Sequence, residues 1–101
     1  MPYKISGLSS KYDLLFKKTE IGKRRVSRAL GMGDTYISHL CAEFSFKKPS
    51  LTVFVEIMNI FDLSIDEFLD DNFTKRLNNI EYIKRLRLSA EKNLKELESK
   101  P

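Results

Sequence analysis

The stretch from Lys23 to Leu40 constrains the fold of this chain more than any other part of the sequence. Its apolar residues have the spacing of two short helices that cross steeply through a tight turn: Val26, Leu30, Met32, Ile37 and Leu40. Val26 and Leu30 stand one helical turn apart and therefore share a face. Gly31 can adopt the positive φ that ends a helix, and Ser27 is small enough to let a second helix approach. The stretch therefore predicts two packed helices joined by a tight turn.

The second of these helices turns small and polar residues outward. They are Asp34, Thr35, Tyr36, Ser38, His39 and Ala42. A short helix that is held rigidly and presents such groups has the shape that fits the major groove of DNA. The pattern predicts a helix-turn-helix motif.

Composition limits the class of protein. With 101 residues, the chain has room for one domain with a modest core. It is 42% hydrophobic and 32% charged, as is typical of a globular protein. No apolar run approaches the ~20 residues that span a membrane, and the N-terminus lacks the apolar core of a signal peptide. A single cysteine, Cys41, cannot form an internal disulfide. We expect a cytoplasmic protein that makes no membrane contact.

Charge is unevenly distributed along the chain. Between Lys11 and Arg28 there are seven Lys or Arg residues and two acids, whereas Pro49 to Thr74 contains six acids and no Lys or Arg. The basic segment coincides with the predicted helix-turn-helix, where attraction to phosphate would be needed. The alternative interpretation is a solvated basic face that binds no partner.

Three further helices are expected in the first 71 residues. The first runs from about Lys11 to Lys18, with Tyr12, Leu15 and Phe16 inward. A later helix is expected to begin after Ser50 and to turn these residues inward: Leu51, Phe54, Val55, Met58 and Phe61. Ser64, followed three residues later by Glu67, has the spacing of a capping box that opens a short helix over residues 65–69.

The last thirty residues predict one long amphipathic helix over residues 72–100. Its main apolar stripe is Ile83, Leu86, Ala90, Leu94 and Leu97. A second, adjacent stripe consists of Phe73, Leu77 and Ile80. The simplest partner for the main stripe is a second copy of the chain, so we predict a homodimer. The alternative is a helix that folds back on its own domain.

From about Ser10 to Leu69 the chain resembles the lambda-repressor-like family of helix-turn-helix domains, of the Cro/CI or XRE type. The turn Leu30-Gly31-Met32-Gly33 is similar to the family's turn, and PSLTVFVEIMNIFDLSIDEFLD, residues 49–70, follows its closing pattern. The resemblance implies an all-α fold: a five-helix bundle over residues 10–71, preceded by an arm (1–9) and followed by the long C-terminal helix (72–101). The chain departs from the family in having Lys23 where glutamine is common and Ser27 where alanine is common.

The resemblance also implies which residues would contact double-stranded DNA. The recognition helix would start at Asp34, and the candidates for base contact are Asp34, Thr35, Tyr36, Ser38 and His39. For Asp34, a capping role is favoured over a contact with cytosine. The phosphate candidates are Lys23, Arg24, Lys47 and Lys48.

A metal-binding or catalytic function is not expected. His39 and Cys41 are two residues apart on a helix, about 200° around it, and cannot bind one ion together. The sequence has no Gly-rich phosphate loop and only one histidine. We expect no enzyme activity, no cofactor and no metal.

The sequence therefore predicts a transcriptional regulator, a repressor of bacterial, phage or mobile-element origin that binds an inverted repeat as a dimer. The alternative is an antitoxin or another protein-interaction module on the same scaffold, which would hold a protein partner through its C-terminal helix or its groove-facing surface. The outward face of the recognition helix keeps this alternative open, since it lacks the usual base readers Arg, Lys, Asn and Gln.

Overall fold

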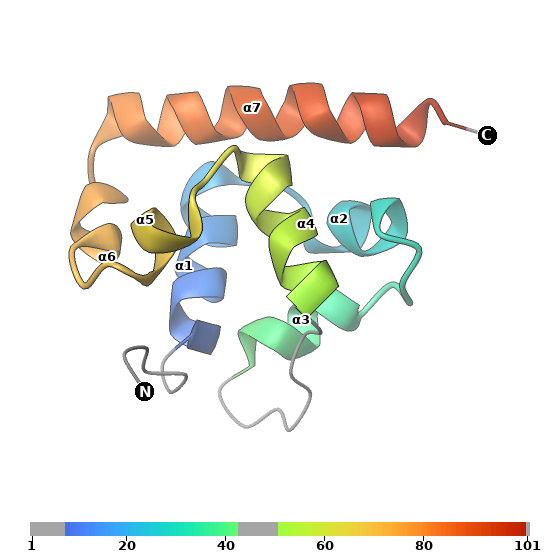
Figure 1. Cartoon of the computed structure of the whole chain (residues 1–101), viewed down its shortest axis with the longest axis horizontal. Helices are drawn as coiled ribbons and strands as arrows, with labels where there is room; N and C mark the ends of the chain where they lie inside the picture. Colours follow the sequence, from blue (N-terminus) through green and yellow to red (C-terminus); the bar gives the residue numbers. More distant parts are fainter. Residues whose placement is uncertain (1–7, 43–50, 101) are drawn as a thin grey trace.

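A long C-terminal helix, α7 (Ile80–Glu98), lies across one side of the molecule, and shorter helices pack beneath it (Figure 1). The computed structural model describes residues 8–42 and 51–100. The helices before α7 are α1 (Leu8–Thr19), α2 (Lys23–Ala29), α3 (Tyr36–Cys41), α4 (Leu51–Phe61), α5 (Ile65–Leu69) and α6 (Phe73–Arg76). Within the described ranges no residue forms a strand, which confirms the predicted all-α class. None of these helices is both long and apolar enough to cross a membrane.

The apolar stripe of α7 is buried inside the chain. Leu86, Ala90 and Leu94 are each 0% exposed, and α7 contacts α4, α1 and α2. Ile83 and Leu97, at the two ends of the stripe, are partly exposed. The prediction that this stripe forms a dimer contact is therefore wrong for its three central residues. The core of the domain already covers them, because the helix folds back on its own bundle.

The prediction of one uninterrupted helix over residues 72–100 is also wrong. The chain turns at residues 77–79, between α6 and α7. The reason is local: Asn79 is extended, with φ −89° and ψ 118°, and its side-chain oxygen accepts hydrogen bonds from the backbone N–H of Glu81 and Tyr82. Such a cap competes with continuation of the helix. The turn leaves Leu77 buried but Ile80 68% exposed, so the second predicted stripe is not continuous.

Helix α1 turns its apolar side inward, as predicted, although it begins at Leu8 and not near Lys11. Tyr12, Leu15 and Phe16 are almost completely buried. The ring of Tyr12 lies 5.1 Å from that of Phe68, and Phe16 meets Phe61 edge to face at 5.4 Å, both measured between ring centroids. Aromatic pairs in such tilted and edge-on arrangements contribute beyond the area they bury.

Helix α4 is rotated relative to its predicted orientation. Of the residues expected inward, Met58 and Phe61 are buried, Phe54 is partly buried, but Leu51 is 74% and Val55 37% exposed. Val53, Ile57 and Ile60 are buried instead. The prediction failed because it let the C-terminal helix leave the domain, whereas α7 packs on α4 and changes which side of α4 is covered.

Several helix ends are satisfied by polar side chains from other helices. Lys11 Nζ donates to the carbonyl of Phe68 at 2.9 Å, and Arg87 Nε donates to that of Thr19 at 2.8 Å. Asn93 Nδ2 donates to two carbonyls at the end of α4. The last carbonyls of a helix have no partner within it, so these contacts stabilise the ends and tie the helices together.

The predicted helix at residues 65–69 is confirmed as α5. Ser64 caps it, since its hydroxyl oxygen accepts from the Glu67 backbone N–H at 3.0 Å. A capping signal that acts over three residues can be read without knowledge of the tertiary structure.

We predict that Leu94→Ala lowers the free energy of unfolding by about 2–5 kcal/mol, because it empties a completely buried site. Leu88→Ala on the same helix is the matched control. Leu88 is 70% exposed, and its replacement should cost less than about 0.5 kcal/mol. The measurement is urea denaturation at several protein concentrations. A loss that grows with dilution would contradict an intramolecular role for Leu94.

Candidate nucleic-acid interface

A buried hydroxyl holds α2 and α3 together. Ser27 on α2 is 0% exposed; its Oγ donates to the carbonyl of Lys23 at 2.8 Å and accepts from the backbone N–H of Ile37 at 3.0 Å. The N-cap residue of α3, Thr35, makes no side-chain capping bond. Ser27 therefore takes over part of that role from the neighbouring helix, and it does more than the small spacer that the sequence suggested.

The turn after α2 has the predicted glycine geometry. Gly31 has φ +74°, its N–H donates to the carbonyl of Arg28 at 3.0 Å, and the N–H of Met32 donates to the carbonyl of Ser27 at 2.9 Å. These two bonds form a Schellman motif, which reverses the chain directly after a helix. Val26 and Ile37 are then brought together in the core at 0% exposure.

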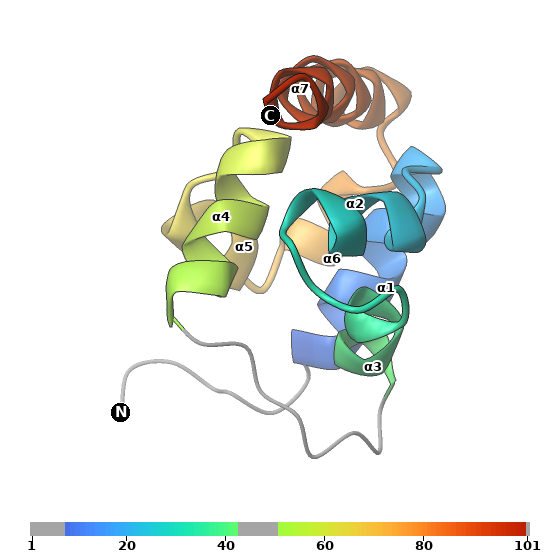
Figure 2. The same cartoon turned by 90° about the vertical axis from the view of Figure 1, so that its right-hand side faces the viewer.

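The predicted base-contact residues lie on the surface. Thr35, Ser38 and His39 are exposed, and Tyr36 is partly buried. Helix α3 begins at Tyr36, two residues later than predicted, so Asp34 lies before the helix and does not cap it. Helix α7 lies at the opposite side of the molecule from α3 and does not cover its exposed side (Figures 1 and 2).

Asp34 is paired with arginines of α2. Its carboxylate accepts from Arg28 Nε at 2.8 Å and from Arg28 Nη2 at 3.0 Å, and Arg24 Nε lies 4.0 Å away. The hydrogen bonds from Arg28 lower the pKa of Asp34 below its usual value, so it stays ionised near neutral pH. The expectation that Asp34 acts as a helix cap is therefore wrong. Its charge is offset by the two exposed arginines of α2.

The basic residues of α2 divide into an outward and an inward group. Arg24 and Arg28 have side chains that are 71% and 63% exposed. Lys23, a predicted phosphate contact, is only 31% exposed and its Nζ lies 3.1 Å from Asp13. Hydrogen bonds from Lys17 and from Lys23 lower the pKa of Asp13. Lys47 and Lys48, the other predicted phosphate contacts, lie outside the described residues.

Arg25 is directed to the long helix. Its Nη1 donates to Glu91 at 2.9 Å, and its Nε and Nη2 donate to Glu98 at 2.9 and 3.1 Å. This double pair fixes α2 against α7 and removes Arg25 from the cations available to a ligand. No sequence signal identified this role of Arg25, because its partners are 66 and 73 residues away along the chain.

The site offers little for metal or nucleophilic chemistry. In the described ranges, no three His, Cys, Asp or Glu side chains are grouped so that they could hold a metal ion. Cys41 is 9% exposed, and desolvation by burial raises the pKa of its thiol to about 11. A thiol in this state is not an effective nucleophile near neutral pH.

Comparison with known proteins gives no match: no family model, curated protein sequence or solved structure matches the chain.

We predict that Ser27→Ala lowers the free energy of unfolding by about 1–2 kcal/mol, because it leaves the buried N–H of Ile37 without an acceptor. Ser38→Ala, at an exposed position of α3, is the matched control and should change stability by less than about 0.5 kcal/mol. Thermal and urea denaturation measure both variants. Equal stability of the two would show that the Ser27 hydroxyl does not support α3.

Proposed function

We propose that this chain is a sequence-specific DNA-binding regulator that reads the major groove through α3, as in the lambda-repressor-like family that its sequence resembles. The observation that supports the proposal most is the exposed surface of α3. It presents Thr35, Ser38 and His39 together, and it is held to α2 by the buried Ser27. A short helix that is rigidly supported and exposed along one side can enter a groove without reorganising the domain.

The proposed base contacts are hydroxyl and imidazole groups. Thr35 and Ser38 can each donate or accept a hydrogen bond, and His39 can bond to guanine. Tyr36, which is partly buried, would flank these contacts. Such groups read base edges less distinctively than Arg or Asn, so shape and flanking phosphate contacts would have to contribute to specificity.

The proposed phosphate contacts are Arg24 and Arg28, the two most exposed cations of α2. Binding would require Arg28 to share its hydrogen bonds between Asp34 and a phosphate, because Asp34 now occupies two of its N–H groups. Asp34 thus weakens attraction to any DNA. We propose that it limits non-specific binding.

A dimer on an inverted repeat remains part of the proposal. Its two recognition helices would enter successive major grooves about 34 Å apart. The contact between protomers would have to use residues other than Leu86, Ala90 and Leu94 of the α7 stripe, since the domain itself covers these three. Action as a repressor of bacterial, phage or mobile-element origin rests on the resemblance, and a cytoplasmic location is proposed from the single cysteine and the N-terminal sequence.

We predict that Arg24→Ala/Arg28→Ala weakens binding to non-specific duplex DNA and lowers the slope of log affinity against log salt by about 2, because two phosphate contacts are lost. Lys84→Ala/Lys92→Ala, which removes the same charge from exposed positions on α7, should change affinity much less. Fluorescence anisotropy at low and moderate salt measures both. If the unmodified chain does not bind DNA at low salt, the proposal of a DNA-binding regulator is overturned and a module that binds a protein partner is favoured.

A second prediction concerns Asp34. Replacement by Asn removes a negative charge beside the proposed phosphate contacts and releases Arg28, so we expect affinity for non-specific duplex to rise roughly fivefold at low salt. Asp66→Asn, an exposed acid on α5, is the control for the change in net charge. An equal rise in both variants would contradict a local effect of Asp34.

A further inference from the structure

An open surface cavity of about 660 Å³, lined by polar and charged residue types, lies where α5, α6 and the first turns of α7 meet. Its walls come from three helices that are joined by short turns. Helix α3 packs mainly on α1 and α2, so the cavity belongs to a different part of the molecule from the proposed DNA interface (Figure 1). Its volume lies in the range of pockets that bind small molecules.

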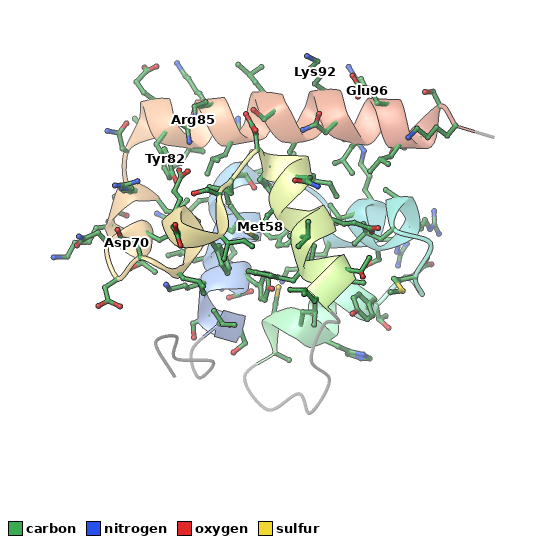
Figure 3. The ribbon with its side chains drawn as sticks, viewed as in Figure 1. Met58, Asp70, Tyr82, Arg85, Lys92 and Glu96 are labelled. Atoms are coloured by element: carbon green, nitrogen blue, oxygen red, sulfur yellow. The ribbon has the colours of Figure 1, made fainter. Side chains whose placement is uncertain are left out.

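One wall of the cavity is a preformed polar network. The hydroxyl of Tyr82 and Nη2 of Arg85 both donate to Glu67 Oε2, the latter at 3.0 Å. The guanidinium of Arg85 also lies over the ring of Tyr82, 4.9 Å from its centroid. Figure 3 shows Tyr82 and Arg85 near the beginning of α7, where they extend toward α5. This network offsets the charge of Glu67 and fixes the orientation of Arg85.

The remaining lining supplies side-chain donors that are not paired with a described carboxylate, whereas the backbone N–H of Asn72 donates to Asp70 Oδ1 at 2.7 Å. Lys75 and Arg76 are exposed residues of α6 that make no ion pair with any described residue, and the guanidinium of Arg76 lies within hydrogen-bonding reach of the Tyr82 hydroxyl. Asn72 makes no capping bond with its side chain. Asn79 uses its side-chain oxygen to cap α7, which leaves its amide N–H groups available. Two cations and two amides therefore line one cavity as donors.

We propose that this cavity binds the phosphate group of a small phosphorylated molecule. Lys75 and Arg76 provide two positive charges that Glu67 does not offset, since Glu67 is already paired with Arg85. A guanidinium matches two oxygens of a phosphate, and the amides of Asn72 and Asn79 can donate to the others. The site is separate from the proposed DNA interface and does not depend on it. Its ligand would be a candidate effector.

The test is a titration of the full chain with inorganic phosphate, followed by ¹⁵N–¹H NMR, with sodium chloride at matched ionic strength as the reference. We expect saturable shifts of the backbone signals of residues 72–82 and of the side-chain amides of Asn72 and Asn79. Lys75→Gln/Arg76→Gln should weaken binding roughly tenfold or more. Lys84→Gln/Lys92→Gln changes the net charge equally outside the cavity, and should bind phosphate as the unmodified chain does. In Figure 3, Lys92 projects from the outer side of α7.

NMR signal shifts that match those in sodium chloride, or that spread evenly over all basic residues, would overturn the proposed phosphate site. Equal weakening in the two double variants would do the same, because it would show a general effect of charge. A duplex DNA titration of the Lys75→Gln/Arg76→Gln variant separates the sources of phosphate. If the duplex affinity of the variant is unchanged, the result supports a small phosphorylated molecule as the ligand. If its duplex affinity falls as much as its affinity for inorganic phosphate, the result would overturn this proposal and favour the nucleic-acid backbone as the ligand.

Discussion

The burial of one side of α7 is the interaction on which the rest of the structure depends. Leu86, Ala90 and Leu94 are completely covered by α1, α2 and α4, and complete burial of a leucine contributes about 1.5–3 kcal/mol. Polar bonds surround this apolar contact: Arg25 reaches α7 from α2, and Asn93 reaches the end of α4 from α7. The long helix therefore fixes the relative positions of α1, α2 and α4, which do not pack extensively on one another.

Most of the other helices are too short to be stable alone. Isolated helices below about 12–15 residues are marginal in water, and α2, α3, α5 and α6 have seven residues or fewer. Their ends are stabilised from outside: Ser27 accepts from the first turn of α3, and Lys11 donates to carbonyls at the end of α5. The same bonds that hold these helices in place make α3 a rigid surface, which is what the proposed recognition of DNA requires.

The basic residues of α2 have different roles, although they are neighbours in the sequence. Arg24 and Arg28 face solvent beside Asp34, whereas Arg25 is held between Glu91 and Glu98. Lys23 is held by Asp13. Successive residues of a helix point in different directions. Some basic residues of α2 therefore form structural ion pairs, whereas others are exposed. Only the exposed ones can attract phosphate.

The sequence by itself determined the features that depend on neighbours a few residues apart. The turn at Gly31, the inward Val26 and the capped start of α5 were all predicted, since periodicity, positive φ and capping are local. The exposure of α3 was predicted for the same reason. The tertiary structure alone decided where the α7 stripe is buried, how α4 is rotated and which acids pair with Arg25. An apolar stripe requires burial without specifying its partner, and pairs 66 or 73 residues apart form only once the helices have packed.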